Sequence, residues 1–135
     1  MNWKLIIALS LFGVAMAFAG VYGITTQQSE AFIWPFIFML YAVIIVKSVS
    51  GNYFLHGFLV SVLNGIWIGA IHALYFHTYI RNNPGVKKLY EDMPHFASPK
   101  ITMVVMAPVF GAIFGLVSGL FAYIASRVLK RKSAS

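Results

Sequence analysis

Residues 101–125 read ITMVVMAPVFGAIFGLVSGLFAYIA, and none of them is lysine, arginine, aspartate or glutamate. About 20 apolar residues in a helix cross a hydrocarbon core about 30 Å thick, so this stretch is long enough to span a bilayer. Residues 5–24, 31–46 and 54–79 lack charged side chains in the same way. The sequence therefore predicts an all-α, polytopic membrane protein with four transmembrane helices.

The composition indicates the same class of protein. Hydrophobic residues make up 60% of the 135 residues and charged residues 10%, whereas charged residues are about 25% of a typical soluble domain. A chain of this length has room for a single transmembrane domain, residues 1–135, and for no separate soluble module. Because the sequence contains no cysteine, it excludes disulfides, thiolate catalysis and thiolate metal sites.

Short polar segments set the expected helix boundaries. Ser29 is a candidate cap for the second helix, and Asn83 followed by Pro84 predicts a short helix in the loop between the third and fourth spans. The first two links are short and only the third is a substantial loop, and we expect the four spans to form an antiparallel bundle. The expected segments are helices at about 4–24, 31–48, 54–80 and 99–127, an extramembrane loop at 81–98 and a basic tail at 127–135.

The first stretch shares some features with a secretory signal peptide. Lys4 precedes an apolar run, and small residues occur at positions 15, 17 and 19, where a signal peptidase could cleave. The apolar run nevertheless continues to Ile24, which gives it the length of a membrane span. We therefore expect an uncleaved first helix.

Basic residues predict the orientation in the membrane. Cytoplasmic segments carry an excess of lysine and arginine, so both termini are expected in the cytoplasm and residues 81–100 outside the cell membrane. The C-terminal cluster is also able to attract anionic membrane lipids. The sequence lacks the basic stripe with interleaved aromatic residues that is typical of nucleic-acid binding. On the expected cytoplasmic side lie six of the ten basic residues, Lys4, Lys47, Arg127, Lys130, Arg131 and Lys132.

Small residues recur every four positions in the third and fourth stretches, so they form a ridge along one face of each helix. In lipid, helix association depends on close backbone packing and on hydrogen bonds between helices, and small residues permit both. We expect these ridges to pack helices within the chain, with contact between copies in a homo-oligomer as the alternative. The glycines of the ridges are Gly57, Gly65, Gly69, Gly111, Gly115 and Gly119.

The third stretch is the only one with a polar face. Its polar side chains fall within an arc of about 80°, at 100° per residue, and bare polar groups are costly in hydrocarbon, so the arc must face other helices or a wet cavity. One interpretation is hydrogen bonding between helices. The other is a polar cavity or proton path in which His72 titrates. The residues of this candidate polar cavity are Ser61, Asn64, His72, Tyr75 and Tyr79.

The sequence carries no catalytic motif, so we do not expect an enzyme. Two residues five positions apart on a helix point in directions about 140° apart, so His72 and His77 do not share a helix face. A pair of His77 with His95 of the loop is geometrically allowed, but no motif supports it. We expect no metal site and no cofactor.

Several segments resemble small four-helix membrane proteins of bacteria. They are Leu9–Gly13, Phe54–Leu59, Asn64–Trp67, and His72 followed by Tyr79. The resemblance implies the four-helix architecture and a bacterial inner membrane, and no activity is assigned to that group. Two functions follow as hypotheses. The chain is a non-catalytic accessory or assembly component that meets a membrane-protein partner, or it is a small transporter or lipid-binding protein with a polar path along helix three.

Overall fold

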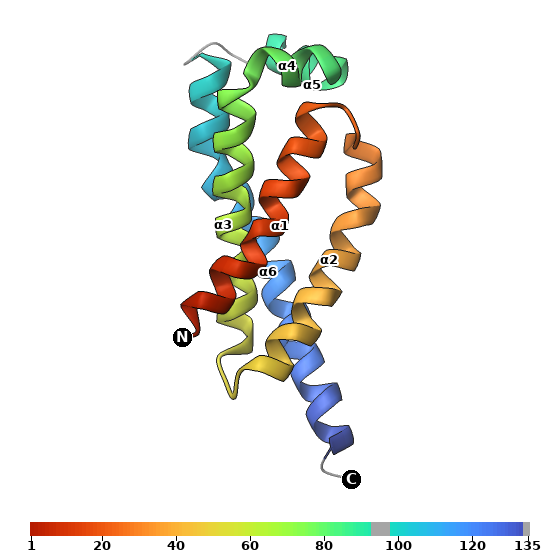
Figure 1. Ribbon diagram of the computed structural model, residues 1–135, viewed down its shortest axis with the longest axis vertical. Coiled ribbons are helices and arrows are strands. Elements are labelled where there is room, and N and C mark those ends of the chain that lie inside the picture. The colour runs from red at the N-terminus through yellow and green to blue at the C-terminus, as the bar shows by residue number, and fades with distance from the viewer. Residues whose placement is uncertain (93–97, 134–135) are drawn as a thin grey trace.

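The computed structural model describes residues 1–92 and 98–133, with side chains up to residue 131. All regular secondary structure in these ranges is helical (Figure 1). The helices are α1 (Trp3–Val21), α2 (Gln27–Ser48), α3 (Tyr53–Leu74), α4 (Phe76–Asn82), α5 (Pro84–Glu91) and α6 (Pro99–Ser133). Helices α1, α2, α3 and α6 are long and apolar enough to cross a membrane. The prediction of an all-helical chain with four candidate spans is confirmed.

The polar links between the helices lie at the two ends of the molecule. Figure 1 shows the N-terminus, the α2–α3 link and the end of α6 at the lower end, and the α1–α2 link, α4 and α5 at the upper end. Helix α3 packs most extensively against α6 and then against α1, whereas α2 packs mainly against α6. Helix α3 is therefore the element that joins the others.

Helices α3 and α6 approach each other backbone to backbone. A Cβ atom built on Gly65 would lie 2.6 Å from the carbonyl oxygen of Ala107 and 2.8 Å from Cα of Gly111. A Cβ on Gly57 would lie 2.7 Å from the carbonyl oxygen of Ser118. Any side chain at these positions would push the helices apart, so the close packing depends on glycine. In lipid this proximity gains dispersion energy and weak Cα–H···O contacts.

The other ridge glycines lie along the same interface. Gly111, Gly115 and Gly119 face the α3 backbone at Val62, Phe58 and Phe54, where a built Cβ would approach to between 2.8 and 3.0 Å of main-chain atoms. At the upper end of the interface, a Cβ on Gly69 would lie 3.1 Å from the carbonyl oxygen of Met103. The contact thus extends over nearly the full length of α3.

A compact apolar core lies where the long helices meet. Its buried members come from α1, α2, α3 and α6, and the rings of Phe38 and Tyr41 are both included. Phe38 also lies near Phe121 of α6, with ring centroids 6.3 Å apart. The buried core residues are Ile6, Leu9, Phe38, Tyr41, Ala42, Ile45, Val60 and Ala122.

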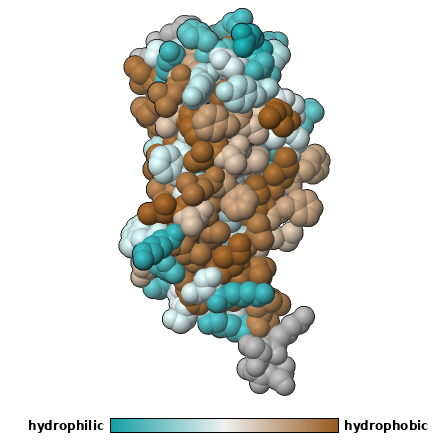
Figure 2. Space-filling model, in the orientation of Figure 1, coloured by the Kyte–Doolittle hydropathy of each residue, from teal (hydrophilic) through white to brown (hydrophobic). Residues whose placement is uncertain are grey.

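The outer surface is apolar where a bilayer would surround it. Figure 2 shows a broad hydrophobic band with hydrophilic residues gathered toward both ends. On α6 alone, Val105, Ile113 and Leu116 are each more than half exposed. Contiguous apolar surface of this extent needs a non-aqueous cover, and four candidate spans provide the matching length.

Some helix boundaries differ from the expected ones for local reasons. Helix α2 begins at Gln27, because Thr26 and not Ser29 is the N-cap; Ser29 instead completes a reciprocal capping box with Thr26. The third helix stops at Leu74, and Tyr75, at φ −103° and ψ 33°, separates it from α4. At the start of α6, the side chain of Ser98 accepts a hydrogen bond from the backbone N–H of Ile101 at 3.3 Å and caps the helix.

The first and last helices also end away from the expected positions. Gly23 has a φ of +70° just beyond α1, a conformation that glycine adopts without steric cost and that ends a helix. Helix α6 continues to Ser133 instead of ending near residue 127. Its last turns consist mostly of good helix formers, and basic residues are favourable near a helix C-terminus.

We expect Gly65→Ala to destabilise the protein because the new methyl group must displace the backbone of α6. Overpacking of this kind costs about 1–3 kcal/mol, more than the gain of up to about 1 kcal/mol from the better helix propensity of alanine. The free energy of unfolding in mixed micelles measures the change. Gly85→Ala in α5 is the matched control, because a Cβ there meets nothing within 4 Å. Equal stability of the two variants would contradict the close α3–α6 packing.

Candidate functional site

Asn64 lies at the centre of the predicted polar face and joins three helices. Its side chain is 2% exposed. Its Oδ1 accepts a hydrogen bond from the backbone N–H of Gly13 at 3.1 Å, and its Nδ2 donates to the hydroxyl of Tyr41 at 3.1 Å. One amide therefore connects α3 to α1 and to α2. In a bilayer such bonds stabilise helix association, because hydrocarbon offers no alternative partner.

The surroundings of Asn64 are apolar and closely packed. Tyr41 is fully buried, and its ring makes an edge contact with Phe12, with centroids 5.8 Å apart. Gly13 has no side chain, which allows Asn64 to reach the backbone of α1. We use the term Asn64 node for Asn64, Gly13 and Tyr41. Sequence reasoning found only Asn64, although a phenol within an apolar stretch is itself a signal that a polar partner is needed.

Two further polar residues of α3 face neighbouring helices. Trp67 Nε1 donates to the hydroxyl of Ser10 on α1 at 3.1 Å, and Ser10 donates to the carbonyl of Ile7. Ser61 is 2% exposed, and its carbonyl oxygen lies 3.1 Å from the place of a Cβ on Gly111. The polar groups around Asn64 thus lie between helices.

Apolar side chains lie between the Asn64 node and His72. Ala17 and Ile71, together with Val21 at the level of His72, are the buried members of one cluster, and Ile68 and Tyr79 pack against them. Along α3, Ile68 and Ile71 follow Asn64 and precede His72; along α1, Ala17 follows Gly13. The predicted arc is therefore divided into two polar regions with apolar side chains between them.

The second polar region brings together His72, Tyr79 and Glu30 at the upper end of the bundle. The rings of His72 and Tyr79 are stacked, with centroids 3.9 Å apart. A Cβ atom built on Gly20 would lie 3.2 Å from Nε2 of His72 and 3.5 Å from Oε1 of Glu30. The imidazole and the carboxylate consequently face the same space above Gly20. We call His72, Tyr79 and Glu30 the upper cluster.

Each member of the upper cluster has a defined environment. His72 Nε2 is buried and has no hydrogen-bond partner among the described residues. The carboxylate of Glu30 accepts a hydrogen bond from the hydroxyl of Thr25 at 2.8 Å. Burial raises the pKa of Tyr79 to about 12, and the charges of Glu30 and Tyr90 act in the same direction. The phenol of Tyr79 therefore stays protonated at neutral pH.

Asparagine side chains hold α4 and α5 against the end of α1. Asn83 Nδ2 donates to the carbonyls of Gly20 at 2.7 Å and Tyr79 at 2.9 Å, and Asn82 Nδ2 donates to the carbonyl of Val21 at 2.9 Å. Asn83 occupies the N-cap position of α5 without a side-chain capping bond, and its Nδ2 links this position to α1. The α4–α5 segment thus closes the upper end of the first span.

Tyr75 and the histidines outside the upper cluster are placed separately. Tyr75 is 43% exposed and makes an edge contact with Phe18, so its side chain does not join His72 in the upper cluster. His77 is exposed on α4, and His95, its suggested partner, lies outside the described residues. Among residues 1–92 and 98–131, no three His, Cys, Asp or Glu side chains converge into a group that could hold a metal ion.

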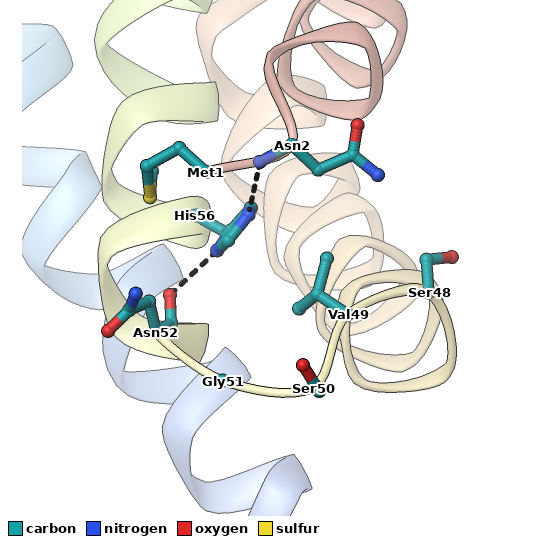
Figure 3. Close-up of a pocket in the computed structure, with 8 residues that line it drawn as sticks. All are labelled: Met1, Asn2, Ser48, Val49, Ser50, Gly51, Asn52 and His56. Carbon is teal, nitrogen blue, oxygen red and sulfur yellow. Dashed lines mark hydrogen bonds between the residues drawn. The ribbon is translucent and has the colours of Figure 1, made fainter.

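At the lower end, His56 fixes the N-terminus to the start of α3. Its Nε2 accepts from the backbone N–H of Asn2 at 3.1 Å, and its Nδ1 lies 2.8 Å from the carbonyl oxygen of Asn52. A neutral ring with its hydrogen on Nδ1 satisfies both contacts. Figure 3 shows this ring between the N-terminus and the α2–α3 link. It lines a hollow whose volume is about 490 Å³. Asn52 has a positive φ of 54°, which gives the link its sharp turn into α3.

Comparison of the chain with protein-family models, with curated proteins and with solved structures found no match. The roles of these residues are therefore inferred from their contacts alone.

The Asn64–Tyr41 hydrogen bond is testable by a double-mutant cycle of Asn64→Ala and Tyr41→Phe. Each single variant leaves a buried polar group of the other residue without its partner, so each is expected to be less stable by about 1–3 kcal/mol. The coupling energy is expected to be about 0.6–1.7 kcal/mol, the range for hydrogen bonds between membrane helices. Unfolding in mixed micelles measures all four proteins. Strictly additive effects would show that the two side chains do not interact.

Proposed function

We propose that the chain is a non-catalytic, multi-pass protein of the bacterial inner membrane that acts as an accessory or assembly component. The observation that carries this proposal is the Asn64 node. The most buried amide of the polar face uses its acceptor and its donor to connect helices, and apolar residues separate it from His72. These contacts favour a helix-packing role for the polar face over a conduction path.

The arrangement of the ends supports an antiparallel bundle with cytoplasmic termini. Successive links lie at alternating ends in Figure 1, and the contacts of α3 with α6 progress from Gly57 with Ser118 to Gly69 with Met103. The lower end carries the basic residues of the N-terminus, the α2–α3 link and the end of α6. By the positive-inside rule this end belongs in the cytoplasm. The ridge glycines then serve packing within the chain.

The upper end offers the surface on which a membrane-protein partner would dock. Helix α5 lies across this end and presents Leu89, which is 50% exposed. Leu74 and Ile24 nearby are 79% and 78% exposed. Lys87 and Glu91 form an exposed ion pair at 3.8 Å on the same helix. A mixed apolar and charged surface at the membrane boundary is typical of protein–protein contact.

Photo-crosslinking in cells tests this role. A photoreactive amino acid replaces Leu89 on α5 or, as the matched control, Ile113, a similarly exposed residue on the lipid-facing side of α6. We expect one discrete adduct with a different protein from position 89 and none from position 113. An adduct of two 15.0 kDa chains would instead indicate a homo-oligomer. The absence of any adduct at position 89, or the same adducts at both positions, would contradict the proposal.

The second candidate is a small transporter or lipid-binding protein with its polar path along α3. The upper cluster favours it, because a carboxylate and an imidazole facing one space are able to exchange a proton through an intervening water. Proton flux into dye-loaded vesicles distinguishes the two functions. Under the accessory role, flux equals that of protein-free vesicles. Flux that His72→Phe abolishes, with the aromatic stack on Tyr79 and the fold retained, would establish the second candidate instead.

A further inference from the structure

The lower end of the bundle contains a hollow with an unusual charge. Its volume is about 1140 Å³, and it lies between the last turns of α6 and the start of α3. Basic and aromatic side chains dominate its lining, and none of its lining residues is acidic. The residues on which the inference depends are Tyr53, Tyr123, Arg127, Val128, Lys130 and Arg131. We call this hollow the basic recess.

No side-chain carboxylate of this chain neutralises the basic recess. The sequence contains three acidic residues, Glu30, Glu91 and Asp92. Glu30 lies in the first turn of α2, and Glu91 and Asp92 lie at the end of α5, all at the opposite end of the molecule (Figure 1). Three neighbouring basic groups repel one another unless a counter-charge lies close to them. An anionic ligand beside Arg127 and Arg131 would lower this repulsion.

Aromatic rings hold the basic side chains in place at the recess. Arg127 Nη2 donates to the hydroxyl of Tyr123 at 2.8 Å, and its guanidinium carbon lies 5.1 Å from the centroid of that ring. Lys130 Nζ lies 4.7 Å from the centroid of Tyr53. A guanidinium has five N–H donors in a planar fork, so Arg127 is able to bind Tyr123 and a phosphate oxygen together. The side chains are thus positioned before any ligand arrives.

The recess also has a polar group that an incoming oxygen would satisfy. The hydroxyl of Tyr53 is buried and has no hydrogen-bond partner among the described residues. A buried hydroxyl without a partner costs free energy, which a phosphate or ester oxygen entering beside the ring would recover.

Apolar surface adjoins the basic groups on the membrane side. Val128 lines the recess and is 51% exposed, and Leu120 and Ile124 continue the exposed apolar face along α6. A ligand that fits this surface has an anionic head and a long apolar tail. Tyrosine at the boundary between them suits the headgroup region of a bilayer.

We propose that the basic recess binds the phosphate headgroup of an anionic phospholipid, whose acyl chains lie along the outer face of α6. Arg127 and Arg131 contact the phosphate, and Lys130 adds charge above the ring of Tyr53. This inference concerns a different end of the molecule from the partner surface on α5 and does not depend on the accessory role.

Lipid titration of the purified full-length protein in neutral detergent tests the proposal. Binding of palmitoyl-oleoyl phosphatidylglycerol and of the zwitterionic phosphatidylcholine with the same chains is followed by native mass spectrometry. The wild-type protein is expected to prefer phosphatidylglycerol. Arg127→Gln combined with Arg131→Gln is expected to raise its apparent Kd about 30-fold, because each basic residue near an anionic headgroup contributes about 1 kcal/mol.

The matched control is Lys87→Gln combined with Lys88→Gln, which removes the same charge from α5 at the opposite end. Its Kd for phosphatidylglycerol is expected to stay within about twofold of the wild-type value. Both arginines are exposed, so an unchanged melting temperature verifies that the fold is intact. A similar loss of affinity in the two double variants, or no preference for phosphatidylglycerol, would overturn the proposal.

Competition with inorganic phosphate identifies the source of the anion. If the acyl chains contribute to binding, an excess of inorganic phosphate leaves phosphatidylglycerol bound. Displacement of the lipid by inorganic phosphate would show that the recess recognises a free anion, and would overturn the assignment to a phospholipid.

Discussion

The structure depends on one constraint, which is that polar groups inside a bilayer must find their partners within the protein. Helix α3 meets this constraint on two sides. On one side its glycines let the backbone of α6 approach to contact distance, as at Gly65 and Gly111. On the other side Asn64 bonds to the backbone of α1 and to Tyr41 of α2. Helix α3 thus contacts each of the other three spans, while α6 provides most of the packing on α2.

Because of the same constraint, the charged side chains lie at the two ends of the molecule. At the upper end, Glu30 lies beside the imidazole of His72 and is held by Thr25. At the lower end, Arg127 lies over the ring of Tyr123 and Lys130 lies over the ring of Tyr53. The ends therefore differ in charge as well as in shape. This asymmetry suits a protein with a fixed orientation, a partner on one side of the membrane and anionic lipid on the other.

The sequence is sufficient for the four candidate spans, because charge-free length is a local property of the chain. It also draws attention to Asn64, since an amide within an apolar stretch is visible in the local sequence. It is not sufficient for the partners of Asn64. Gly13 and Tyr41 lie on other helices, and their pairing depends on helix rotation and tilt, which hydropathy does not specify. For the same reason, hydropathy does not indicate that Glu30 lies near His72. No proline or glycine near Tyr75 indicates in the sequence that the helix is interrupted between α3 and α4.

The central claim is that α6 faces lipid on one side and the backbone of α3 on the other. Because the chain lacks cysteine, single nitroxide-labelled cysteines placed at the non-glycine positions of residues 104–120 in lipid vesicles test it most directly. Collision with oxygen is expected to rise and fall with a period of about 3.6 residues, with maxima near Ile113 and minima near Ala107 and Ser118. Collision with a water-soluble nickel chelate is expected to stay low throughout. High nickel accessibility at Ile113, or oxygen maxima on the Gly111 side, would contradict the account.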